Sequence, residues 1–262
     1  MPTISLTAVW DETRAYLLRE AALLIPVALG TIGVATVILS LATPAQAPGV
    51  AMQPGPWMYW LLPWFLLLAM GTLALSTLAM VPGISVREAL TRAGARLGPA
   101  IGATALLGLG ALLLLFLIGR AAALVAQLVG MGAAQASALG MALALPVLVM
   151  FAMRFLFLFP ALVEQRGVIA GLRASWRASE SCKWRLLLLW IGLGLVSLLL
   201  LATIEYGVGS LLLILSRALG DPALGVLLVR LVVALVSSLI QLITISYFAR
   251  LYVSASRPSR GI

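Results

Sequence analysis

The sequence predicts an all-α integral membrane protein with six transmembrane helices, arranged as three hairpins that are each preceded by a cytoplasmic-side amphipathic helix. Three observations lead to this fold class. Apolar residues make up 63% of the 262 residues, charged residues make up 10%, and the mean hydropathy is +1.16. A soluble domain has too little interior for that balance. The apolar residues also form runs of membrane length, and short basic segments separate these runs.

The first hairpin is expected between residues 6 and 80. Residues 6–20 have the pattern of an amphipathic helix. One side is formed by Leu6, Val9, Trp10, Thr13, Tyr16 and Leu17, and the opposite side by Asp11, Glu12, Arg14 and Arg19. The first span follows at about 21–41. The next segment, 42–56, carries no charge and four prolines, which predicts an irregular loop. The second span, at about 57–80, begins with a cluster of aromatic residues that is typical of a membrane interface.

The second hairpin begins after Pro82-Gly83, which should break the helix. Segment 85–97 starts with the capping-box pattern Ser85-Val-Arg-Glu88 and continues as a narrow amphipathic helix with a Glu88–Arg92 pair. The third span is expected from about Pro99 to Gly119, followed by a softer apolar stretch to Gly132. The fourth span runs from about 137 to a boundary between 154 and 159. Gly98 and Gly102 form a GxxxG pattern that favours close helix packing within the chain.

The third hairpin follows segment 160–185, which holds five of the 17 Lys/Arg residues. On a helical wheel, one face of this segment is apolar and is formed by Val168, Ile169, Leu172 and Trp176. The next face is formed by Arg173, Arg177 and Glu180. This pattern is typical of a helix that lies in the headgroup layer, with its apolar side toward lipid. The fifth span is expected at about 186–204 and the sixth at about 224–247, with a turn at Asp221-Pro222.

The distribution of basic residues predicts the orientation of the chain. With six spans, both termini lie on one side together with segments 81–98 and 160–185. That side holds 13 of the 17 Lys/Arg residues, and the other four are Arg120, Arg154, Arg217 and Arg230. By the positive-inside bias the richer side is cytoplasmic. We therefore expect a multi-pass protein of the bacterial inner membrane with cytoplasmic N and C termini.

The three amphipathic helices are spaced by about 81 residues, counted between Val9, Leu90 and Leu172. This spacing suggests three repeat units, at 5–83, 84–166 and 167–252, within one transmembrane domain that covers 1–262. Phe151-Ala-Met-Arg154 also resembles Phe248-Ala-Arg250. All three units start on the same side of the membrane, which argues against the inverted-repeat transporter folds.

Two segments carry a resemblance to a known group: Ser-Val-Arg-Glu-Ala-Leu at 85–90 and Gly-Leu-Arg-Ala-Ser-Trp-Arg at 171–177. With the six-span layout, they make the chain similar to the YciC-like bacterial inner-membrane proteins. The same group includes the multi-pass region attached to some glycerophosphoryl diester phosphodiesterases. The resemblance covers nearly the whole chain and implies a membrane protein without a settled activity. In the phosphodiesterase members the chemistry belongs to a separate soluble domain, which we do not expect here.

The composition argues against catalysis. The chain has no histidine and a single cysteine, Cys182, so an internal disulfide is impossible and zinc or iron–sulfur sites are disfavoured. The eight acidic residues are scattered, and no general acid–base pair is evident. We therefore expect no enzyme activity, no catalytic or metal-binding residues and no cofactor. The pI near 11 is better explained by topology and anionic lipid than by nucleic acid.

Charges near or within the spans are the next candidates. Arg154 either contacts a substrate or lipid phosphate inside the bundle or, as we favour, snorkels to the cytoplasmic headgroups as Arg250 would. Glu205 is expected near the far interface with Arg230 or Arg120. A structural clasp is favoured there over an ion pathway, because the spans carry no further acid that could relay a proton.

The function that this pattern favours is a non-enzymatic membrane protein that binds anionic lipid, or a partner protein, through its cytoplasmic amphipathic helices. The candidate headgroup-binding residues are Arg173, Arg177, Lys183, Arg185, Arg87, Arg92 and Arg96. Two alternatives remain. Arg173 and Arg177 could instead pair with Glu164 and Glu180 as internal struts. The protein could also be a transporter, lipid translocator or channel with a path through the bundle.

Overall fold

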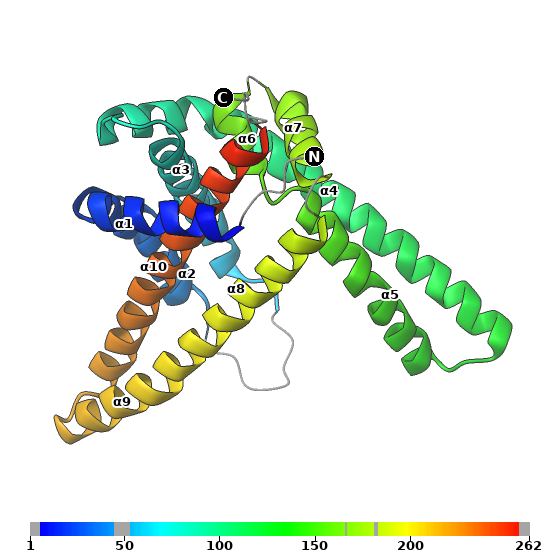
Figure 1. Cartoon of the computed structure of the whole chain (residues 1–262). Helices are drawn as coiled ribbons and strands as arrows, with labels where there is room; N and C mark the ends of the chain where they lie inside the picture. Colours follow the sequence, from blue (N-terminus) through cyan, green and yellow to red (C-terminus); the bar gives the residue numbers. More distant parts are fainter. Residues whose placement is uncertain (1–5, 45–52, 166, 181–182, 257–262) are drawn as a thin grey trace. The chain divides into compact units, whose positions relative to one another are not determined.

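The computed structural model describes residues 6–44, 53–165, 167–180 and 183–256 (Figure 1). Arg166 and Cys182 lie outside these residues. The described part of the chain is all-α and contains no strand, which confirms the predicted fold class. Six helical segments are long and apolar enough to cross a membrane, at Leu6–Ala42, Pro56–Met80, Val86–Val129, Ala133–Glu164, Trp184–Ala218 and Ala223–Ser256. The chain is therefore a multi-pass membrane protein with the predicted number of spans.

The chain packs into two compact units. The first unit comprises residues up to 97 and from 188 onward, and the second comprises 98–187. Their limits fall inside the long helices α4 (Val86–Val129) and α8 (Lys183–Thr203), which run from one unit into the other. The units therefore do not coincide with the three expected repeats, which stay a prediction.

The long helix α10 (Pro222–Ser256) is the centre of the first unit. Around it pack α1, the π-helical turn η1, α2, α3, η3 and α9. The elements of this unit, with the short helix η2 before α3, have the bounds α1 Leu6–Ala28, η1 Leu29–Gly33, α2 Val34–Ala42, η2 Pro56–Trp60, α3 Leu61–Met80, η3 Ile204–Val208 and α9 Gly209–Ala218. The fully buried residues here include large ones, such as Leu24, Leu73 and Tyr247, and small ones, such as Ala28, Ala35, Ala74 and Ala249. Small side chains let helix backbones approach closely in a membrane protein.

The second unit contains most of α4, then α5 (Ala133–Arg154), α6 (Leu158–Glu164), α7 (Val168–Glu180) and the first turn of α8. Helices α4 and α5 form a hairpin, in which Gly140 lies against Ala122 and Gly110 against Phe151. Helix α7 packs on both α5 and α6. The candidate site of the next section lies at this junction.

Several helices are longer than predicted. Helix α4 has 44 residues and is continuous across the predicted boundaries at Pro99 and Gly119. At 1.5 Å per residue it is about 66 Å long, roughly twice the hydrocarbon thickness of a bilayer. The amphipathic segment 85–97 is thus the first part of α4 and no separate helix. Likewise, segment 6–20 is continuous with the start of the first span in α1.

Four turns between helices contain a glycine with positive φ, whereas three prolines lie inside helices. Pro26, Pro99 and Pro146 all lie inside helices, where membrane helices tolerate them. The described residues with positive φ are instead four glycines between helices, Gly83, Gly130, Gly167 and Gly220. The helix boundary predicted at Pro99 is therefore wrong.

Two of these turns share one hydrogen-bond pattern. After Gly130, the Met131 N–H donates to the Ala126 carbonyl at 2.8 Å. After Gly220, the Asp221 N–H donates to the Ser216 carbonyl at 3.0 Å. Both are six-to-one bonds of the Schellman type, which satisfy helix-end carbonyls without water. Helices α4 (Val86–Val129) and α9 (Gly209–Ala218) therefore end in the same way.

The close packing of α3 on η1 in the first unit can be tested by a substitution at Gly71. A Cβ atom at Gly71 would overlap the Thr31 side chain of η1 and lie 3.0 Å from Ile32 Cγ1. We predict that Gly71→Leu destabilises the protein by about 2–3 kcal/mol through overpacking. The measurement is thermal unfolding in detergent. Gly192→Leu is the control, because a Cβ at Gly192 meets nothing within 4 Å. Equal melting temperatures for the two variants would contradict the α3–η1 contact.

Candidate functional site

Helix α7 occupies residues 168–180, so the predicted helix is confirmed, and it packs on the protein with a side that the sequence analysis did not single out. The buried residues are Gly171, Ser175, Ala178 and Ser179. Ile169 and Trp176, from the predicted apolar face, are exposed. Helix α7 therefore has three sides: a small-residue side packed on protein, an exposed side with Ile169 and Trp176, and a charged side.

The small-residue side allows close packing on α6. A Cβ atom at Gly171 would come within 2.5 Å of Leu162 Cδ2 of α6. At the start of the helix, a Cβ at Gly102 of α4 would lie 3.2 Å from Val168. Gly98, the other glycine of the predicted GxxxG pattern, has open space around it. The spacing Gly171-x3-Ser175-x3-Ser179 is a small-residue pattern that could have identified this face in the sequence.

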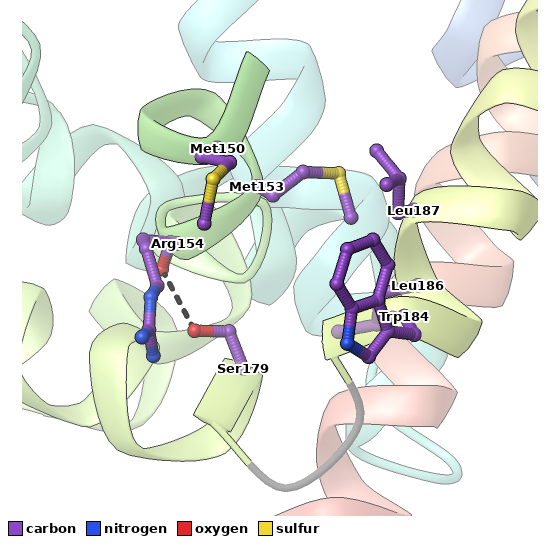
Figure 2. Close-up of a pocket in the computed structure, with 7 residues that line it drawn as sticks. All are labelled: Met150, Met153, Arg154, Ser179, Trp184, Leu186 and Leu187. Atoms are coloured by element: carbon purple, nitrogen blue, oxygen red, sulfur yellow. Dashed lines mark hydrogen bonds between the residues drawn. The ribbon is translucent and has the colours of Figure 1, made fainter. Parts of the chain in front are cut away.

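The two buried serines of α7 satisfy a helix end. Arg154 is the last residue of α5, and the last carbonyls of a helix lack partners within it. The Ser175 hydroxyl donates to the Arg154 carbonyl at 3.1 Å. The Ser179 hydroxyl lies 3.3 Å from the same oxygen (Figure 2). Helix α7 thus provides a hydrogen bond to the last carbonyl of α5.

The Arg154 side chain extends onto α7. Its guanidinium carbon lies 4.5 Å from the centre of the Trp176 ring, and its Nη1 lies 3.7 Å from Glu180 Oε1. The side chain is 18% exposed. Helix α5 ends at Arg154, although the apolar segment that could cross a membrane continues to Glu164. The guanidinium, however, packs on an aromatic ring of the protein, an arrangement that neither interpretation anticipated.

Arg250 makes matching contacts in the first unit. It lies on α10, with its guanidinium carbon 4.4 Å from the centre of the Tyr16 ring of α1. Its Nη1 is 3.8 Å from Glu12 Oε2, and the side chain is 21% exposed. The Tyr247 hydroxyl also donates to the Leu6 carbonyl at 3.4 Å. The sequence match between Arg154 and Arg250 therefore coincides with the same set of contacts, which we call the arginine clamp: an arginine near a span end, on an aromatic ring and beside a glutamate of another helix.

The charged side of α7 presents Arg173 and Arg177 to the exterior. Both side chains are exposed, and neither forms an ion pair or hydrogen bond with any residue that the structure describes. Glu180 contacts Arg154. The alternative in which Arg173 and Arg177 pair with Glu164 and Glu180 is therefore wrong.

The remaining headgroup candidates lie in two places. In the second unit, Arg185 is exposed in the first turn of α8, while the Lys183 side chain lies outside the described part. In the first unit, Arg87 is exposed, Arg92 donates to Glu88 at 2.6 Å and Arg96 is half-buried at the start of α4. The Ser85 hydroxyl accepts the Glu88 N–H at 3.2 Å, as the capping pattern predicted. The two sets belong to different units.

The predicted clasp around Glu205 is absent from the first unit. Glu205 is exposed in the π-helical turn η3, and Arg230 is half-buried on α10. The two described side chains form no ion pair with each other. The extra residue per turn of a π-helix re-aims its side chains, and here it leaves Glu205 and Tyr206 exposed. Arg120 is exposed on α4, in the second unit.

A small cavity of about 100 Å³ lies beside the clamp, between α5, α7 and the start of α8 (Figure 2). Its walls are mainly apolar and are formed by Met150, Met153, Arg154, Ser179, Trp184, Leu186 and Leu187. An apolar cavity of about 150 Å³ holds a benzene molecule. The space beside Arg154 is therefore suited to a small apolar group.

No group of three or more potential metal ligands is found among the described residues. Comparisons of the chain with protein-family profiles, curated proteins and solved structures gave no match. The resemblance to the YciC-like group therefore stays a prediction. The surface of α7 is the feature that bears most directly on function.

The clamp makes a prediction about stability. A guanidinium on a tryptophan ring is worth about 0.5–2 kcal/mol, more when it is desolvated. The ion pair adds little, because Glu180 is 58% exposed. We predict that Trp176→Leu destabilises the protein by about 1–2 kcal/mol in thermal or denaturant unfolding. Trp184→Leu is the matched control, since exposed Trp184 stacks on no described arginine. A larger loss for the control would contradict the clamp.

Proposed function

We propose that the chain is a non-enzymatic protein of the bacterial inner membrane that binds anionic lipid headgroups through α7. The sequence supports the absence of catalysis, since it has no histidine and its carboxylates are scattered. Helix α7 lies in the cytoplasmic headgroup layer, and both termini are cytoplasmic, in line with the distribution of basic residues.

The observation that carries the proposal is the division of α7 into three sides. The small-residue side is used by the protein, so it is unavailable for other contacts. Exposed Ile169 and Trp176 suit the boundary between headgroups and acyl chains, where tryptophan is enriched. Arg173 and Arg177, one turn apart, suit the phosphates just above that boundary.

Magnitudes support a role for the two arginines together. A basic residue close to an anionic membrane surface contributes about 1 kcal/mol, and this attraction falls off within a Debye length of about 8 Å. Arg173 and Arg177 then contribute about 2 kcal/mol, which corresponds to a roughly 30-fold change in affinity. Arg185, with Arg87, Arg92 and Arg96 of α4, would add to the same attraction wherever they face the same leaflet.

The lipid proposal predicts a selective effect of Arg173→Gln/Arg177→Gln. We expect the double variant to keep its fold and to lose about 30-fold in affinity for phosphatidylglycerol. Binding is measured by native mass spectrometry or by titration of nanodiscs that contain phosphatidylglycerol in phosphatidylcholine. The loss should shrink as salt is raised, because salt already screens the wild-type attraction.

Arg120→Gln/Arg217→Gln is the matched control, because both arginines are exposed and unpaired among the described residues but lie on the predicted far side. Unchanged lipid binding in the α7 variant would contradict the proposal. Loss of a co-purifying protein with lipid binding intact would assign the surface to a protein partner instead.

The orientation has its own test. In a Cys182→Ser background, we expect a cysteine at Ala174 of α7 to react with a thiol reagent only from the cytoplasmic side. A cysteine at Ala134, in the first turn of α5, should react only from the opposite side. The measurement is labelling of intact cells against inverted membrane vesicles. Labelling of the Ala174→Cys variant in intact cells by an impermeant reagent would overturn the orientation.

A further inference from the structure

The charged side of α7 carries an acid that could cancel its basic residues. Glu180 lies three residues after Arg177, a spacing at which opposite charges on one helix attract each other. If Glu180 paired with Arg177, the helix would present only one uncompensated arginine to the headgroups. In the structure Arg177 makes no such pair among the described residues, and Glu180 lies beside Arg154 of α5 instead.

We propose that Arg154 is a positioning residue for the lipid-binding side of α7: it compensates Glu180, so that Arg173 and Arg177 stay available to anionic headgroups. This inference rests on the proposed function and concerns how the positive charge of that same surface is kept available. Arg154 is suited to this role because its guanidinium is fixed from two directions, by the Trp176 ring and by its place at the end of α5.

The geometry indicates that the Arg154–Glu180 pair acts through charge more than through stability. The two groups are 3.7 Å apart, which is beyond hydrogen-bond length, and Glu180 is 58% exposed. Exposed pairs of this kind contribute little to folding. Arg154 itself is held by the aromatic ring. Removing the Glu180 charge should therefore change the field at the surface of α7 while the fold stays intact.

The second clamp is independent support, because it recurs in the other unit. Arg250 lies on Tyr16 of α1, and Glu12 of the same helix lies 3.8 Å from Arg250 and is 71% exposed. In both clamps the glutamate and the aromatic residue are four positions apart on one helix, so they share a face. An exposed acid compensated by an arginine from another helix thus occurs twice in the described part of the chain.

Four variants test the inference, with phosphatidylglycerol in phosphatidylcholine nanodiscs as the probe. Glu180→Gln should raise the affinity about fivefold without changing the melting temperature, because one negative charge is removed. Arg154→Gln should lower the affinity about fivefold, because Arg154 then no longer compensates the negative charge of Glu180. The double variant Arg154→Gln/Glu180→Gln should return to the wild-type affinity. Arg250→Gln, with the same charge change at the other clamp, should leave the affinity of the α7 surface unchanged.

The outcomes separate the alternatives. If Arg154 itself binds the phosphate, the double variant stays as weak as Arg154→Gln, and the positioning role is overturned. If only the net charge of the protein matters, Arg250→Gln weakens binding as much as Arg154→Gln, which also overturns it. If Arg154→Gln fails to fold, Glu180→Gln decides alone, and unchanged affinity there refutes the inference. Failure of the proposed function is distinct: in that case Arg173→Gln/Arg177→Gln has no effect.

Discussion

The absence of water in the bilayer interior is the constraint on which this structure depends. A backbone carbonyl or N–H without a partner costs several kcal/mol where lipid or packed protein excludes water, so a helix end that is shielded in this way must find its own hydrogen bonds. The chain meets this demand in two ways. At Gly130 and Gly220 the backbone closes on itself through six-to-one bonds. At Arg154 the carbonyl accepts the Ser175 hydroxyl from α7, so that the end of one helix fixes the position of another.

The second arrangement determines which residues of α7 remain on the exterior. Because Gly171 and Ser175 are committed to α6 and α5, the larger and charged residues are left on the exterior. Arg154 then closes the junction from the other side, through the Trp176 ring. A surface helix held by small residues, a shared carbonyl and a cation on an aromatic ring keeps its basic side in one orientation. We propose that this fixed orientation is what lets Arg173 and Arg177 meet anionic headgroups.

The number of spans and the helix at 168–180 could be predicted from the sequence, because membrane-length apolar runs and a 3.6-residue charge pattern are local properties. The limits of α4 could not, because a proline such as Pro99 either breaks or continues a helix according to its surroundings. The buried side of α7 was missed for a related reason. Hydrophobicity assigned Ile169 and Trp176 to the lipid-facing side, and both are exposed. It did not single out Gly171, Ser175 and Ser179, because small residues carry little hydrophobic signal even though they often mediate helix contacts in membrane proteins. The Glu205–Arg230 pair could not be tested against the sequence alone, because the exposure of Glu205 depends on its place in the π-helical turn η3.

The central claim, that α7 lies in the headgroup layer with its Ile169 side in lipid, is tested most directly by the membrane depth of a spin label. The label is attached to a cysteine at Ile169 in a Cys182→Ser background, and its collision rates with oxygen and with a water-soluble nickel complex are measured in lipid bilayers. The account predicts high oxygen and low nickel accessibility, at a depth just below the phosphates. High nickel accessibility would place this side of α7 in water and contradict the claim.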